Sequence, residues 1–278
     1  EALIAFLLRR DWEESVAARK HMDGPGDAWY DGLDPWLARL NREVKPVVLE
    51  VRVRDVSARF DLNRVGRAEG RPRKYGDDLI TRQKEAAGEF ARLCKAFGYA
   101  DGETAAEILR DWVDADEEGD HEEGAPHRPL VSVYELAGVG RLADDAAWRR
   151  LTADPAFLAC VTVHSGVGQD EGLVNVNTAP VEVLEAITES RETAEAIVQG
   201  RPYEENVYNS PLNEAMGTEA YNRYYHRLAV ESRGVRVEAV ARVGPLRIER
   251  TTVIARQDGG TEVRLRLPGS GVREESES

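Results

Sequence analysis

An acidic loop carries the side chains whose types and spacing could do chemistry in this chain. Carboxylates crowd the segment from position 111 to position 123, directly after an expected helix that ends near Trp112. We expect Trp112 to be buried and to force the following carboxylates together, where they repel one another unless a cation neutralises them. Oxygen-rich loops with alternating Asp residues bind hard cations such as Ca²⁺. The loop therefore predicts one or two Ca²⁺ ions, and its candidate ligands are Asp114, Asp116, Asp120, Glu122 and Glu123.

Two other interpretations of this loop stay open. Its spacing is not that of an EF-hand, because no Glu closes the coordination shell at the twelfth position. Runs of charge often simply face water, so a solvated loop is one alternative. A hydrolase that uses Asp114 and Asp116 with a metal is the other, although no nucleophile or base accompanies the pair. No catalytic residue is therefore assigned.

A second motif, Val174-Asn175-Val176-Asn177-Thr178-Ala179, introduces a pair of short helices. Thr178 is expected to cap the first helix, with a proline in its first turn. The pair resembles helix-hairpin-helix modules, whose glycine-rich hairpin offers backbone N–H groups to DNA phosphates. Here positions 188–192 hold no glycine and two acids, Glu189 and Glu192. We therefore expect a packing unit whose Asn side chains tie down the turn, and a nucleic-acid-binding protein of competence type is the alternative.

Composition limits the function classes. The chain has 278 residues, 42% of them hydrophobic and 32% charged, which is typical of a soluble globular protein of one large or two moderate domains. Its 37 basic and 51 acidic side chains give a formal net charge of −14, which disfavours a general role in nucleic-acid binding. Two cysteines are present, Cys94 and Cys160, and their spacing is compatible with a disulfide or with two buried thiols.

Hydrophobic periodicity predicts the elements that position these motifs. Residues 47–56 alternate as in a half-buried strand, residues 77–231 have mostly helical spacing, and three strands follow at 235–243, 246–255 and 261–267. Because a lone strand cannot bury its apolar face, we expect the first strand to join the later three in one antiparallel sheet. The predicted fold class is α+β, with a large all-α domain, containing the helix-hairpin-helix-like unit, inserted between the first strand and the rest of the sheet.

An apolar helix opens the chain. Leu3, Ile4, Leu7 and Leu8 share one face at helical spacing, and we expect this face to be divided between the protein's own sheet and partner helices, with Ile4 and Leu8 outward. The chain starts without Met and within this helical pattern, so a signal or membrane anchor is expected upstream. The expected boundaries are 1–60 and 228–268 for the sheet domain, 61–227 for the helical domain and 269–278 for a disordered tail.

Several motifs in one order resemble the K-type minor pseudopilins of the bacterial type II secretion system, the general secretion pathway protein K family. The resemblance covers nearly the whole chain and includes the order of strand, helical insertion and meander. The matching segments are 1–8, 53–63, Asp111-Trp112-Val113-Asp114-Ala115-Asp116, Ser132-Val133-Tyr134-Glu135-Leu136 and 174–179.

The resemblance implies a pilin-like domain, in which the N-terminal helix lies on the antiparallel sheet, interrupted by the helical domain. It also implies a non-enzymatic protein at the tip of the periplasmic pseudopilus, anchored in the inner membrane by a helix upstream of this chain. The implied partners are the I- and J-type minor pseudopilins, with which it primes pseudopilus assembly and protein export. The secretin or the exported cargo are further implied contacts, and nucleic acid is not.

The resemblance also bears on the acidic loop, because family members bind Ca²⁺ near the helical domain. The family often carries Gly-Ala-Glu after the acidic signature, whereas this chain has Gly124-Ala125-Pro126. A ligand expected after Ala125 is therefore missing.

Overall fold

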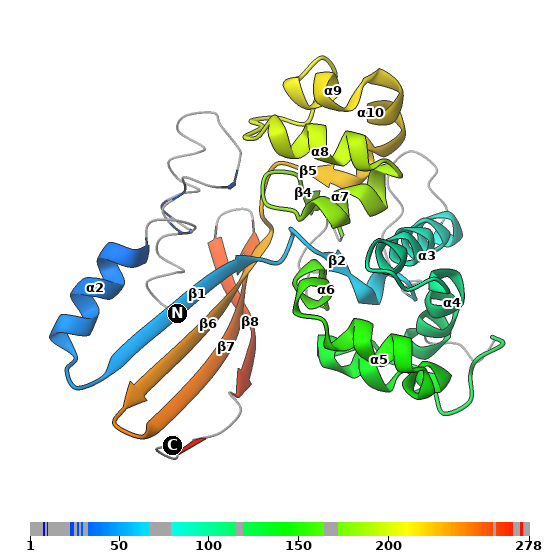
Figure 1. Ribbon diagram of the computed structural model, residues 1–278. Coiled ribbons are helices and arrows are strands. Elements are labelled where there is room, and N and C mark those ends of the chain that lie inside the picture. Colours follow the sequence, from blue (N-terminus) through cyan, green and yellow to red (C-terminus); the bar gives the residue numbers. More distant parts are fainter. Residues whose placement is uncertain are drawn as a thin grey trace.

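The long strands lie together in one part of the molecule and most of the helices in another in the computed structural model (Figure 1). The structure describes residues 8, 10, 23–24, 27, 29, 33–66, 79–114, 119–163, 172–257, 260–268 and 273–274. The strands are β1 (Val48–Asp55), β2 (Phe60–Asp61), β3 (Val161–Thr162), β4 (Val174–Asn175), β5 (Leu228–Ala229), β6 (Gly234–Val243), β7 (Leu246–Gln257), β8 (Gly260–Pro268) and β9 (Arg273–Glu274). The α-helices are α2 (Leu33–Glu43), α3 (Leu79–Ala96), α4 (Gly102–Val113), α5 (Ala146–Ala153), α6 (Pro155–Cys160), α7 (Val181–Thr188), α8 (Arg191–Gln199), α9 (Pro211–Met216) and α10 (Thr218–Tyr224). The 3₁₀ helices are η1 (Leu62–Arg64), η2 (Val133–Gly138), η3 (Gly140–Asp144) and η4 (Tyr225–Arg227).

The main sheet has the strand order β1-β6-β7-β8, with all neighbours antiparallel. Strand β1 pairs with β6 along its whole length, from Val48 opposite Arg242 to Asp55 opposite Val235. Strands β6 and β7 are joined by a tight turn in which Gly244 has φ +56°, a conformation that glycine adopts without steric cost. The predicted α+β fold class is thus confirmed, because the first strand joins the C-terminal meander.

One face of the sheet holds a small core of its own. Val235, Val237 and Ile254 are buried there against Leu8 and Trp29. Leu8 was expected to face outward toward partners, but it is only 2% exposed and packs on its own sheet. The other three residues of the predicted interface, Leu3, Ile4 and Leu7, lie outside the described residues.

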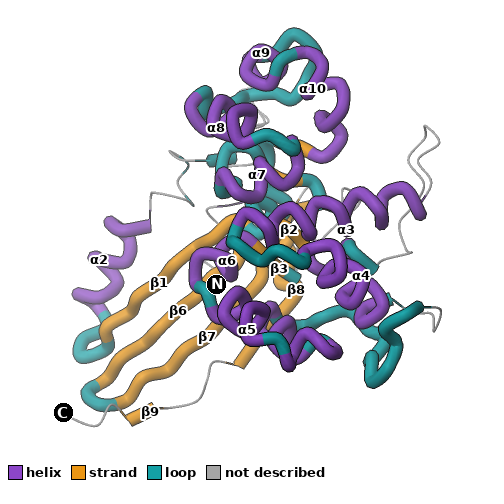
Figure 2. Tube along the Cα trace, turned by 45° about the vertical axis from the view of Figure 1, so that its right-hand side comes forward, coloured by secondary structure: helices purple, strands orange, loops and turns teal. Residues whose placement is uncertain are grey.

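Helix α2 lies beside β1 (Figure 2), whereas helices α3 to α10 gather beyond the end of the sheet at which β1 finishes and β6 begins (Figure 1). A separate and larger core joins them, centred on aromatic side chains such as Phe90 and Trp148, whose rings meet edge to face at 6.4 Å. Both cysteines are free and buried in this core, and burial raises the pKa of Cys160 to about 12. Of the two possibilities left open by the sequence, buried thiols are therefore the one observed.

The C-terminal segment 269–278, predicted to be disordered, has one described part. Arg273 and Glu274 form strand β9, which pairs with Leu246 and Arg247 of β7. Nothing else in this segment lies within the described residues. Among the helices that the structure describes, none combines the length and the apolar run needed to cross a bilayer.

Candidate functional site

The acidic loop begins where α4 ends. Ile108, Leu109 and Val113 of this helix are buried in the helical core, which fixes the orientation of its last turn. Asp114 leaves the helix in an extended conformation while its N–H still donates to the Arg110 carbonyl at 2.9 Å. The Asp114 side chain is consequently held at the helix terminus, and the residue is only 7% exposed.

Asp111, one turn before, anchors the returning part of the loop. Its Oδ1 accepts from the Arg110 guanidinium at 2.9 and 3.1 Å, and its Oδ2 accepts from the His121 N–H at 3.1 Å. Trp112, which was expected to be the buried residue here, is partly buried, whereas Asp111 is 1% exposed. Burial of the charged neighbour is made possible by these hydrogen bonds.

The loop then curls back over the end of α4. The Ala125 N–H donates to the Glu122 carbonyl at 3.0 Å, and Gly124 and His127 both adopt left-handed backbone conformations, with φ +76° and +47°. A left-handed conformation is uncommon for a residue with a Cβ. Here it turns the His127 ring toward Glu122.

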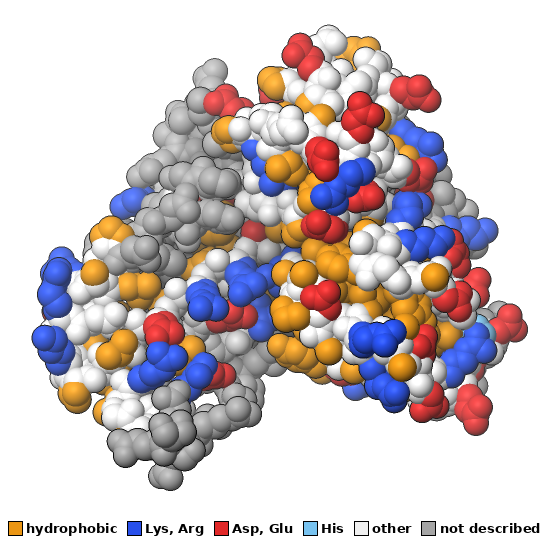
Figure 3. Space-filling model, in the orientation of Figure 1, with side chains coloured by type: hydrophobic (Ala, Val, Ile, Leu, Met, Phe, Trp, Pro, Cys, Tyr) orange, Lys and Arg blue, Asp and Glu red, His pale blue; other side chains and the backbone are white. Residues whose placement is uncertain are grey.

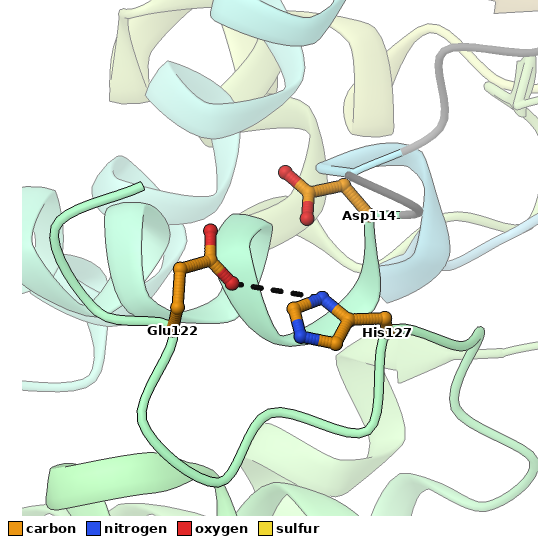
Figure 4. Close-up of side chains that lie close together, drawn as sticks. All are labelled: Asp114, Glu122 and His127. Carbon is orange, nitrogen blue, oxygen red and sulfur yellow. Dashed lines mark ion pairs between the residues drawn. The ribbon is translucent and has the colours of Figure 1, made fainter. Parts of the chain in front are cut away.

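Three potential metal ligands meet at this place (Figure 4). One ligand atom each from Asp114, Glu122 and His127 lies within 4.8 Å of the other two, and Glu122 Oε2 is 3.6 Å from His127 Nδ1. Both carboxylate oxygens of Glu122 and the Nδ1 atom of His127 are buried without a hydrogen-bond partner. Buried polar atoms are normally hydrogen-bonded, so these atoms are placed as ligands of an ion would be.

Gly119 provides the room for this arrangement. A Cβ atom at this position would lie 2.4 Å from Glu122 Oε1 and 2.5 Å from Asp111 Oδ2. The Asp111 and Glu122 carboxylates therefore approach the backbone of Gly119 closely. Any larger side chain at this position would displace one of them.

The outcome for the predicted ligands is mixed. Asp114 and Glu122 are brought together, and Asp116 lies outside the described residues. Asp120 and Glu123, also predicted as ligands, are exposed and do not belong to the group of residues whose ligand atoms converge. His127 was missed; it stands one residue after Pro126, the position at which the family resemblance leads one to expect a ligand.

A different polar cluster joins the sheet to the helices; we call it the junction network, and it consists of Asp23, Asp55, Asn175, Asn177, Thr178, Tyr203, Val230 and Ser232. Asp55, at the end of β1, is 4% exposed, and burial raises its pKa against the opposing effect of hydrogen bonds from Ser232 and Thr178. The Asp55 Oδ2 atom accepts from the Thr178 hydroxyl at 2.5 Å, the Ser232 hydroxyl at 2.5 Å and the Asn175 amide at 3.0 Å. The hydroxyl of Thr178, predicted to cap α7, is thus engaged elsewhere, and Pro180 is the residue at the N-cap.

The two Asn side chains complete this network. Asn175 also donates to the Asp23 carbonyl at 3.0 Å and accepts from the Asn177 N–H at 3.0 Å. Asn177 donates to the Tyr203 carbonyl and accepts from the Tyr203 N–H, at 2.9 and 2.7 Å. The predicted role of these side chains, tying down the turn before the helix pair, is therefore what the structure shows.

The hairpin between α7 and α8 is acidic. Glu189 takes the left-handed position there with φ +58°, and Ser190 caps α8 by accepting from the Thr193 N–H. Arg191, exposed at the start of α8, forms ion pairs with Glu182, Glu185 and Glu195. Figure 3 shows acidic and basic side chains interspersed over these helices. Phosphate binding at this hairpin would have to displace carboxylates, so the nucleic-acid alternative is not supported.

Comparisons with known proteins agree with one another. Residues 174–210 match the family model described as type II secretion system (T2SS), protein K. The curated type II secretion system protein K of Pseudomonas aeruginosa is 28% identical over 283 residues, which cover 98% of this chain and 79% of the relative. The chain resembles protein K over almost its whole length. The fold matches a chain in the crystal structure of the GspK-GspI-GspJ complex from enterotoxigenic Escherichia coli, with a TM-score of 0.57, 16% identity and coverage of 95% and 98% of the two chains.

The segment that matches the family model includes part of the junction network. Residues 174–210 contain Asn175, Asn177 and Tyr203 of the junction network together with the helix pair α7 and α8. The segment that matches the family model is thus one that attaches the helices to the sheet.

Proposed function

We propose that this chain is a minor pseudopilin that assembles with I- and J-type minor pseudopilins at the tip of the type II secretion pseudopilus, where it primes pseudopilus assembly and protein export. The observation that carries the proposal is the match of sheet and helical insertion together, over 95% of the chain, to a protein solved in a GspK-GspI-GspJ complex. The role is one of assembly, not of catalysis. The secretin and the exported cargo are further candidates for contact with the tip.

The proposal places the described part of the protein in the periplasm, attached to the inner membrane through a helix that precedes this chain. Contact with the partners is proposed for the opening segment because its apolar face, read from the sequence, is the one expected to meet partner helices. Leu8 is committed to the core of the sheet with Trp29, so the outward side of this segment must be provided by other residues. Ile4, expected outward from its spacing, is the residue that we propose for partner contact.

Co-expression of this chain with its I- and J-type partners tests the assembly. We expect a stable heteromer on co-purification, and we expect Ile4→Glu to reduce recovery of the partners about tenfold or more, as loss of an interface hot spot does. Val131→Glu is the matched control, because Val131 is 58% exposed on the helical part and far along the chain from the opening segment. A chain that folds but recovers neither partner would refute the proposed assembly, and equal losses in both variants would refute the proposed interface.

We further propose that a divalent cation binds at the end of α4. The supporting observation is the convergence of Asp114 and Glu122 beside the Nδ1 atom of His127, which is buried and has no hydrogen-bond partner. The two carboxylates suit Ca²⁺, the ion that the resemblance implies, whereas an imidazole nitrogen is not a ligand that Ca²⁺ prefers. When bound, the ion would neutralise the carboxylates and tie the loop to the helix.

Thermal unfolding with and without a chelator tests the cation site. Ligand linkage predicts a gain of about 2.7 kcal/mol in the free energy of unfolding when free cation reaches 100 times its dissociation constant. The double variant Asp114→Asn, Glu122→Gln should lose this gain. The matched control, Asp120→Asn with Glu123→Gln, removes the same charge from exposed positions of the same loop and should keep it. No response of the wild-type protein to any divalent cation would refute the site.

A further inference from the structure

The donor set at the end of α4 differs from a calcium site in one respect. Among the residues that the structure describes, three ligand atoms converge here: carboxylate oxygens of Asp114 and Glu122, and the imidazole nitrogen Nδ1 of His127. Ca²⁺ takes six to eight oxygen ligands, whereas Zn²⁺ and related transition ions bind imidazole and carboxylate in sites with three protein ligands and a water. An imidazole nitrogen beside carboxylates is the kind of donor set that suits the second class.

The spacing of the donors points in the same direction. Two ligands of a tetrahedral ion at about 2.0–2.2 Å lie roughly 3.4 Å from each other. Glu122 Oε2 and His127 Nδ1 are 3.6 Å apart, and the Asp114 oxygen is within 4.8 Å of both. A small movement of the Asp114 side chain would complete a three-ligand site.

Burial leaves the nitrogen little else to bind. His127 Nδ1 is buried and has no hydrogen-bond partner, and its nearest ionic neighbour is the Glu122 carboxylate, which is itself without a hydrogen bond. The neighbouring His121 is differently placed. Its backbone N–H donates to Asp111 Oδ2, and its ring nitrogen Nε2 lies 3.4 Å from Arg141 Nη2. The two histidines of this loop therefore form a natural pair of test and control.

We propose that His127 makes this loop selective for a transition-metal ion of the Zn²⁺ class over Ca²⁺, with Asp114 and Glu122 as the other protein ligands. The proposal rests on the proposed cation site and specifies the ion. His127 sets the selectivity and the two carboxylates supply the charge.

Calorimetric titration of the full chain with Zn²⁺ alone and with Ca²⁺ alone tests it. We expect Zn²⁺ to bind more tightly than Ca²⁺, with one ion per chain. His127→Asn should weaken Zn²⁺ binding by roughly 10–100-fold or more and leave Ca²⁺ binding within about threefold, because Asn replaces the nitrogen by an amide oxygen and tolerates the left-handed backbone. His121→Asn, the same substitution in the same loop, should leave both affinities unchanged.

Co²⁺ provides a readout independent of affinity. A three-ligand site of low coordination number should give visible absorption on Co²⁺ binding, and the absorption should be absent in His127→Asn. Binding of Ca²⁺ in preference to Zn²⁺, or equal Zn²⁺ affinity of wild type and His127→Asn, would overturn the proposed selectivity and leave the cation site intact. Failure of both ions to bind would overturn the two proposals together, and His127 would then be only the ion-pair partner of Glu122.

Discussion

The junction network and the loop at the end of α4 are both buried polar clusters built around acidic side chains, yet they differ in how their hydrogen-bonding atoms are used. In the junction network, Asp55 accepts through both carboxylate oxygens, from the Ser57 N–H on one side and from three side chains on the other. In the loop, both oxygens of Glu122 and one nitrogen of His127 are buried without hydrogen bonds. The first cluster is saturated by the protein itself, and the second is not.

This difference separates a structural role from a ligand-binding role. A buried polar network whose members are satisfied specifies one arrangement of the elements that it joins, here the sheet and the helix pair. A cluster in which buried atoms lack hydrogen bonds, as the Glu122 oxygens and His127 Nδ1 do, costs free energy unless something else binds those atoms. The two clusters should therefore differ in the sign of the stability change: removing a member of a saturated cluster should destabilise the protein, and removing a member of the other should not.

The largest loss of stability is expected on substitution of Glu89, in another saturated cluster within the helical core. Its carboxylate accepts from Arg227 at 2.7 and 2.8 Å and from Arg64 at 3.2 Å, and the residue is 3% exposed. Glu89→Gln would leave two buried guanidinium groups without their counter-charge, which typically costs about 3–5 kcal/mol. Chemical denaturation at pH 7, followed by circular dichroism, measures the loss.

The same denaturation experiment, repeated at acidic pH, gives an independent check of the role of Glu89. Burial by itself would raise the pKa of Glu89, but the charges and hydrogen bonds of Arg227 and Arg64 lower it to about 2. Because the folded-state pKa is lower than the unfolded value of about 4.3, the Glu89 contribution is complete above that value and is lost as the pH falls toward 2. The difference in free energy of unfolding between wild type and Glu89→Gln should therefore shrink as the pH falls over this range. A difference that stays constant from pH 5 to pH 2.5 would contradict the proposed role of the Glu89 ion pairs.

Asn175→Ala should produce the next largest loss. The substitution deprives the Asp23 carbonyl and the Asn177 N–H of their side-chain partner and opens a small cavity at the junction. Each buried group left unsatisfied costs about 1–3 kcal/mol, so we expect a loss of about 2–4 kcal/mol. Asn206→Ala is a suitable comparison: Asn206 donates to two carbonyls, those of Tyr225 and Leu228, but it is only half-buried. A smaller loss for Asn175→Ala than for Asn206→Ala would remove the distinction drawn here.

Thr178→Val removes a single hydrogen bond from the junction network. It keeps the shape of the side chain and removes the hydroxyl that donates to Asp55, so the expected loss is about 1 kcal/mol at pH 7. The pKa of Asp55 is already raised by burial, and loss of this hydroxyl should raise it further. A carboxyl with a raised folded-state pKa gives more stability as the pH falls through that pKa, because the folded state then binds the extra proton. The loss of unfolding free energy in Thr178→Val relative to wild type should therefore become smaller toward pH 4. A loss that grows on acidification would contradict this expectation.

The sequence predicts the two clusters to different extents, for a physical reason. Strands β6 to β8 follow the predicted ranges to within two residues, because period-two alternation and the Gly-Pro turn are local signals. The tying role of Asn175 and Asn177 is also visible locally, since one Asn bonds to the backbone two residues away. The role of Thr178 is not visible locally, because its hydroxyl donates to Asp55, which lies 123 residues earlier in the chain.

His127 illustrates the same limit at the candidate metal site. It stands 13 positions after Asp114, and no helix or strand period relates the two. Their approach depends on left-handed backbone at Gly124 and at His127 itself, which returns the loop to the end of α4. The sequence thus indicates that acids accumulate here and which helix precedes them, whereas the nitrogen donor emerges from the tertiary path of the loop.

The smallest expected effect has the opposite sign and tests the comparison most directly. Asp114 stands at the C-terminal end of α4, where the helix dipole is unfavourable to negative charge, and its carboxylate lies near that of Glu122. In the presence of a chelator, Asp114→Asn keeps the shape of the side chain and removes both repulsions, so stability should be unchanged or rise by up to about 1 kcal/mol. With a saturating divalent cation the order should reverse, because wild type gains binding free energy that the variant has lost. Paired denaturation curves of the two proteins, with chelator and with cation, measure this crossing. If Asp114→Asn is as destabilising as Asn175→Ala without cation, then the loop is a saturated structural cluster like the junction, and the argument for a bound ion fails with it.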